Sequence, residues 1–128
     1  MSTLTISNLN DGTTTVPTTF VTNGSAKAWH LLDGTGTIST LSSFNVSSAT
    51  DNGTGNYVTS LSNSMSNANY IISGTAIGNA SNNYYSHITS DGATSDVVAG
   101  SYEYHMKHHS GSTNDINRIR TVVHGDLA

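Results

Sequence analysis

The chain has 128 residues, enough for one small domain. Serine, threonine, asparagine and glycine make up about half of it, only 9% of residues are charged, and the net charge is −4. Four lysines and arginines are too few for the basic surface that contacts nucleic-acid phosphates. The sequence also lacks the run of roughly 20 apolar residues that a membrane span needs, and it has no basic, apolar leader at its start. We therefore expect neither nucleic-acid binding nor membrane insertion.

The chain has few apolar residues from which to build a hydrophobic core of its own. Hydrophobic residues amount to 34%, and there is no cysteine, so disulfides cannot stabilise the fold. Small domains in this position commonly depend on oligomerisation. The composition therefore predicts a homo-oligomer.

In chain order, the first segments alternate in the manner of strands, and residues 1–24 are the most polar part. We interpret residues 1–24 as a short extended N-terminal arm, used for attachment or oligomer contact. A strand is expected over residues 15–22, where Pro17 belongs at a strand edge or end because it has no amide hydrogen. Residues 26–32 predict the next strand and include the sole tryptophan, Trp29, which we expect to be buried.

The middle of the chain predicts a β-hairpin over residues 44–61, turning at the Asp, Asn and Gly residues of 51–55. Within it, Tyr57, Thr59 and Leu61 should share one face, because side chains alternate along a strand. The adjacent isoleucines of residues 69–74 indicate a buried strand.

Three further strands are expected in the second half, over residues 84–89, 97–109 and 116–124. Short strands separated by turn residues are typical of sandwiches and barrels. The predicted fold class is all-β, an antiparallel β-sandwich or a jelly-roll-like barrel, with residues 25–128 as a single domain. We expect at most one short helix.

The chain offers little for catalysis. It lacks a Gly-x-Ser-x-Gly nucleophile elbow, and Glu103 is the only glutamate. We therefore expect no enzyme and no cofactor. His105 and His109 would lie about 13 Å apart along a strand at ~3.3 Å per residue, too far to share one metal ion. One chain therefore predicts no metal site, although a threefold axis could join copies of His105, His108 or His109, and that alternative stays open.

The tyrosines of the second half are the candidate binding residues. Tyrosine offers a large contact area at low entropic cost, in the company of small polar residues. We predict that this half faces a partner, with packing between subunits or in a half-buried sheet as the alternative. The candidate residues are Tyr84, Tyr85, Tyr102 and Tyr104.

Several stretches of residues 1–75 resemble a module common in tailed bacteriophages of marine and freshwater bacteria. They include Asn23-Gly24-Ser25-Ala26-Lys27-Ala28-Trp29, Asp33-Gly34-Thr35-Gly36-Thr37-Ile38, Thr50-Asp51-Asn52-Gly53-Thr54-Gly55-Asn56-Tyr57 and Met65-Ser66-Asn67-Ala68-Asn69-Tyr70. The family consists of virion structural proteins, usually tail-fibre or fibre-like appendage subunits that are commonly trimeric. The resemblance carries no catalytic residue.

The resemblance implies a virion-located appendage subunit, a homotrimer that attaches to the host surface or to other virion proteins. The surface partner would be a host glycan or protein. Three alternatives remain: a capsid decoration or head-fibre protein, a carbohydrate-binding module, and a depolymerase. The last would need at least two acids facing one groove, and the sequence favours it least.

Overall fold

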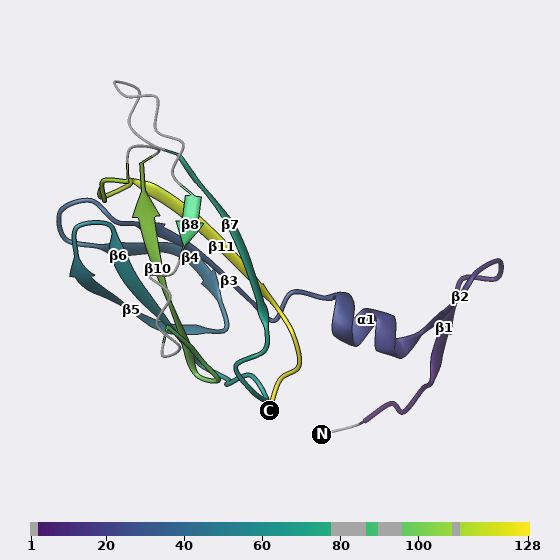
Figure 1. Ribbon diagram of the computed structural model, residues 1–128. Coiled ribbons are helices and arrows are strands. Elements are labelled where there is room, and N and C mark those ends of the chain that lie inside the picture. The colour runs from purple at the N-terminus through teal and green to yellow at the C-terminus, as the bar shows by residue number, and fades with distance from the viewer. Residues whose placement is uncertain (1–2, 78–86, 90–95, 109–110) are drawn as a thin grey trace.

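The computed structural model describes residues 3–77, 87–89, 96–108 and 111–128. Over these residues the protein is an antiparallel β-sandwich with one short helix, which confirms the predicted fold class. Figure 1 shows the sandwich with an N-terminal segment standing off from it.

Two sheets form the sandwich, and every pairing in them is antiparallel. The β3–β11 sheet has the order β4 (Ser39–Phe44), β3 (Ala28–Asp33), β11 (Arg118–His124), β7 (Ile71–Ile77). The β6–β10 sheet has the order β5 (Val46–Gly53), β6 (Asn56–Leu61), β10 (Ser101–Lys107), β8 (His87–Thr89), and β9 (Val97–Val98) also pairs with β10.

The predicted hairpin is present as β5 and β6, paired from Val46 with Leu61 to Gly53 with Asn56. Its turn uses positive φ angles, 120° at Gly53 and 66° at Gly55, which glycine adopts without strain. Tyr57, Thr59 and Leu61 point into the core from β6, as predicted.

The hairpin begins later than expected, because Phe44 ends β4 in the other sheet. Asn45 follows with φ 55°, a left-handed conformation that asparagine tolerates better than most residues, and carries the chain between the sheets. Its side chain fixes this corner: Nδ2 donates to the Lys27 carbonyl oxygen at 3.0 Å, and Oδ1 accepts the Asn63 amide hydrogen at 2.7 Å.

Tyrosines dominate the core between the sheets. The Tyr104 ring lies between two others, with its centroid 5.9 Å from that of Tyr57 and 5.8 Å from that of Tyr102. Such separations suit tilted aromatic pairs. Aliphatic side chains and methionines complete the core: Ala28, Leu32, Leu61, Met65, Met106, Ile116, Ile119 and Val123.

Buried hydrogen bonds join the two sheets. His30 of β3 is 2% exposed, and its Nδ1 lies 3.0 Å from Thr59 Oγ1 of β6 in the other sheet. Its Nε2 lies 2.9 Å from Thr40 Oγ1 of β4, in a part-buried contact within its own sheet. The Tyr102 hydroxyl of β10 lies 2.7 Å from Thr121 Oγ1 of β11. Buried polar groups are costly unless paired, so these bonds let a core with few apolar residues include polar ones.

Two predicted elements are wrong. Residues 15–22 are not one strand: β2 (Thr15–Pro17) pairs with β1 (Asn8–Asn10), and helix α1 (Thr18–Gly24) follows. Pro17 cannot donate to a ladder, and its φ of −57° suits a helix start, so the strand ends there. The isoleucine strand is an edge strand, β7, in which Ile71 is exposed rather than buried.

The prediction for Trp29 is also wrong, because its side chain is 40% exposed. The inward positions of β3 belong to Ala28, His30 and Leu32. Trp29 therefore points outward, opposite Phe44 on β4 and Val122 on β11.

Candidate interaction surface

The structure corrects the placement of two of the four candidate tyrosines. Tyr102 and Tyr104 are buried in the core, at 0% and 1% exposure, because both lie on the inward face of β10. Burial raises the pKa of both hydroxyls. They are core residues, not the surface binding residues that the sequence predicts. Tyr84 and Tyr85 lie outside the described residues.

The histidine cluster is only partly visible, because His109 lies outside the described residues. His105 is buried on β10, with its Nε2 3.5 Å from Glu103 Oε1. Within the described part of the chain, no three His, Cys, Asp or Glu side chains gather in a metal-binding group.

The N-terminal segment, residues 3–24, is built from local interactions, and we call it the arm. Its hairpin turn is closed by Asp11, whose Oδ1 accepts the amide hydrogens of Thr14 at 2.7 Å and Thr13 at 2.9 Å, which lowers the pKa of that carboxyl. The amide of Thr18 donates to the Ser7 carbonyl oxygen at 2.9 Å and so joins the start of α1 to the hairpin. Hydrogen bonds within the arm therefore close its hairpin and join the hairpin to α1.

The arm leaves its apolar side chains uncovered. Of residues 3–24, all but Thr18 are exposed, and Phe20 on α1 is 70% exposed. Figure 1 shows β1, β2 and α1 extending away from the sandwich, so the sandwich does not cover them. The large exposed apolar residues of the arm are Leu4, Ile6, Leu9, Val16, Phe20 and Val21.

Lys27 attaches the arm to the sandwich. Its Nζ donates to the Thr22 carbonyl oxygen near the end of α1, and it lies 3.2 Å from the Ser25 carbonyl oxygen and 3.1 Å from Ser25 Oγ. The Lys27 amide donates to the Val123 carbonyl oxygen at 2.8 Å, which connects the same residue to β11. The end of α1 is thus held against the sandwich.

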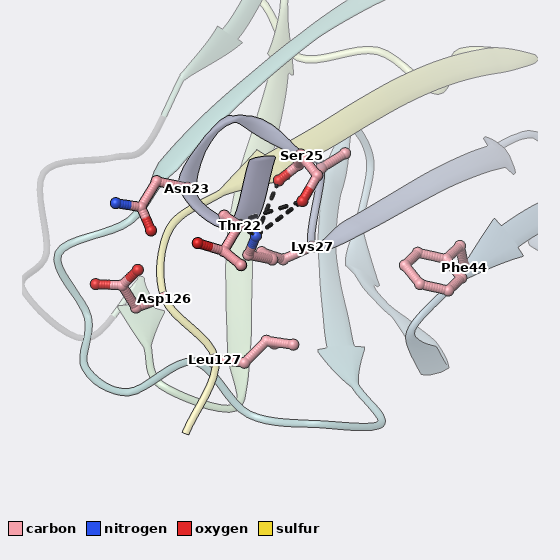
Figure 2. A pocket seen from close by; sticks show the side chains of 8 residues that line it. Thr22, Asn23, Ser25, Lys27, Phe44, Asp126 and Leu127 are labelled. Atoms are coloured by element: carbon pink, nitrogen blue, oxygen red, sulfur yellow. Dashed lines mark hydrogen bonds between the residues drawn. The ribbon is translucent and has the colours of Figure 1, made fainter. Parts of the chain in front are cut away.

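A hollow of about 610 Å³ lies at this junction, and its lining is largely apolar. Figure 2 shows Leu127 and Phe44 on two sides of it, with Lys27 bonded to the end of α1 above. Phe44 is 53% exposed and Leu127 is also exposed. We call this site the root hollow; its lining residues are Thr22, Asn23, Ser25, Ala26, Lys27, Phe44, Asp126 and Leu127.

The outer face of the β3–β11 sheet continues the apolar surface beyond the root hollow. Phe44, Trp29 and Val122 lie in one cross-strand row, since Trp29 pairs with both neighbours. The next row contains Leu31 and the exposed Arg120. An exposed aromatic row with a nearby guanidinium can bind an apolar protein segment or stack on a sugar ring.

The arrangement of apolar and aromatic side chains on this surface therefore supports binding of a partner.

The sequence did not predict the root hollow, because Leu127 is far from Phe44 in the chain. Among the described residues, no helix has the length and hydrophobicity to span a membrane.

Comparison with protein-family models, with curated proteins and with solved structures finds no match.

Proposed function

We propose that this chain is a non-enzymatic virion structural protein, a subunit of a tail fibre or fibre-like appendage. In this proposal it assembles as a homotrimer and attaches the appendage to the host surface or to other virion proteins. The observation that carries the proposal is the arm: a folded extension with an uncovered apolar surface, on a domain with a small core of its own.

The uncovered apolar side chains of the arm favour assembly. Exposing many apolar side chains together is unfavourable in water, and large apolar patches on soluble proteins usually mark interaction sites. Residues 3–24 are also close in number to the roughly 20–30 residues that one partner contributes to a standard protein interface. The resemblance of residues 1–75 to phage appendage modules supports the virion setting.

The experiment is immunogold labelling of virus particles with an antibody raised against this chain, together with light scattering of the purified protein. We expect label on the tail appendages and a trimeric mass. Label spread over the capsid lattice would instead support a capsid decoration or head-fibre protein. Particles without label would refute the virion proposal.

A carbohydrate-binding module is the second candidate, and the exposed pair of Trp29 and Phe44 favours it. Aromatic rings on an open sheet face offer stacking surfaces for sugars. A monomeric protein that binds host polysaccharide, and loses that binding on Trp29→Ala, would support this candidate over the appendage subunit.

A further inference from the structure

We propose that the root hollow receives Phe20 from the arm of a neighbouring copy, so that each subunit inserts one arm and accepts another. This inference rests on the proposed homo-oligomeric function and names the partner surface for it. In it, the Phe20 ring lies between Phe44 and Leu127 of the next copy. It follows from the shape and lining of the hollow and from the chemistry of the arm.

The hollow has the size for an apolar side chain, and Ala26, Phe44 and Leu127 offer apolar contacts on its wall, which also carries the Lys27 ammonium and the Asp126 carboxylate. Its volume of about 610 Å³ is within the roughly 300–1,000 Å³ of typical protein binding pockets. The one ammonium on its wall, that of Lys27, is already bonded to the carbonyl oxygens of Thr22 and Ser25. An apolar side chain that enters the hollow therefore does not bury an ammonium that lacks hydrogen-bond partners.

The walls of the hollow are fixed before any partner arrives. Phe44 directly precedes Asn45, whose side chain is bonded to Lys27 and Asn63 on either side. The backbone of Leu127 forms an isolated antiparallel β-bridge with Met65 of the core. The neighbouring Ala128 amide donates to the Ser64 carbonyl oxygen at 3.0 Å. A preformed site lowers the ordering cost of binding.

The arm supplies a matching occupant. Phe20 is the largest apolar side chain of residues 3–24, and it is 70% exposed on α1. The only charged residue of the arm is Asp11, in the hairpin turn remote in sequence from α1, so the helix brings no charge into the hollow. The Thr18 amide bonds the start of the helix to the Ser7 carbonyl oxygen of the hairpin segment, which reduces the backbone entropy lost on insertion.

Within one chain, Phe20 is not among the residues that line the hollow. Lys27 holds the end of α1 at the rim through Thr22, and the rest of the arm extends outward. A Phe20 ring that enters the root hollow would therefore come from another copy. A contact between two different surfaces of identical subunits is heterologous, and repeated with closure it generates a ring. In a closed ring of three, each root hollow would receive one Phe20.

Cysteine cross-linking tests the contact directly, because the natural chain has no cysteine. Full-length Phe20→Cys and Phe44→Cys chains are co-expressed and treated with a short thiol-reactive cross-linker. We expect covalent dimers in the mixture and few in either variant alone. Phe20→Cys co-expressed with Ile77→Cys is the matched control, since Ile77 is 53% exposed but lies at the end of β7, outside the hollow.

A charge substitution gives the second measurement. Phe20→Asp should convert the oligomer to monomer at micromolar concentration with an unchanged far-ultraviolet circular dichroism spectrum, whereas Ile77→Asp should leave the oligomer intact. An oligomeric wild-type protein that is unaffected by Phe20→Asp, with no cross-link in the mixture, overturns this contact but not the proposed assembly. A monomeric wild-type protein overturns the assembly itself. Saccharide binding lost on Phe44→Asp while the oligomer persists would assign the hollow to a sugar and also overturn the contact.

Discussion

Replacing His30 with leucine tests whether the hydrogen bonds of this buried histidine stabilise the sandwich. Leucine is uncharged and fills much of the imidazole's space, so the change chiefly removes the bonds to Thr59 and Thr40. A typical hydrogen bond contributes about 0.5–1.5 kcal/mol net, so we expect His30→Leu to lower the free energy of unfolding by about 1–3 kcal/mol at pH 7.5. Urea unfolding followed by circular dichroism measures it, with an unchanged m-value expected.

The pH dependence of this difference provides the sharper test. Burial lowers the pKa of His30 below its ordinary value of 6.5, so the unfolded chain takes up a proton there before the folded one does. Well above pH 6.5 the imidazole is neutral in both the folded and the unfolded state, so it adds no pH dependence to the free energy of unfolding. As the pH falls below 6.5, the wild type loses up to about 1.4 kcal/mol per pH unit until the folded state also protonates.

His30→Leu has no imidazole to take up this proton. The difference in free energy of unfolding between wild type and variant should therefore narrow as the pH falls from 7.5 to 5.5. Thr59→Val is the matched control, because it removes one bond but keeps the imidazole and hence the wild-type pH dependence. A gap that stays constant over this range would refute the reasoning, as would a cost below about 0.5 kcal/mol at pH 7.5.

Three further outcomes follow from the packing. Gly34→Ala should destabilise the fold by about 1–3 kcal/mol in urea unfolding, because the new Cβ would meet the Tyr57 hydroxyl, and a near-neutral result would contradict the close approach. Trp29→Ala should cost about 1 kcal/mol rather than the 3–5 kcal/mol of a buried aromatic, since the ring is 40% exposed; a cost above 3 kcal/mol would show that it is buried. Burial raises the pKa of Tyr70 to about 12 and also raises that of Tyr102 and Tyr57, so stability should fall as the pH rises above 10.0, where the unfolded chain ionises first. Ultraviolet titration of tyrosinate would contradict this if all tyrosines ionised near pH 10 in the folded protein.

Alternation along the chain was sufficient to predict the fold class and several strands. Tyr57, Thr59 and Leu61 share the buried face of β6 because strand geometry alone determines which side chains alternate. The turn at Gly53 and Gly55 was likewise predictable, since glycine adopts positive φ at low cost. Neighbouring residues in the chain determine these features, so the sequence alone was sufficient to predict them.

Features that depend on distant partners were not predictable. Tyr102 and Tyr104 resemble surface binding residues in the sequence, but they fill the core because they occupy inward positions of β10. Trp29 occupies an outward position because His30 is paired to Thr59 across the sandwich, which alternation cannot reveal. The root hollow joins the end of β4 to the C-terminus, and only the folded topology brings them together.

Light scattering of the purified full-length chain at micromolar concentration tests the central claim most directly, namely that the chain is an assembling structural subunit. The account predicts a concentration-stable homotrimer, with three times the 13.4 kDa mass of one chain. Since subunit association links stability to protein concentration, the unfolding midpoint should also rise as the protein is concentrated. A folded monomer of 13.4 kDa, with an unfolding midpoint independent of concentration, would contradict the account.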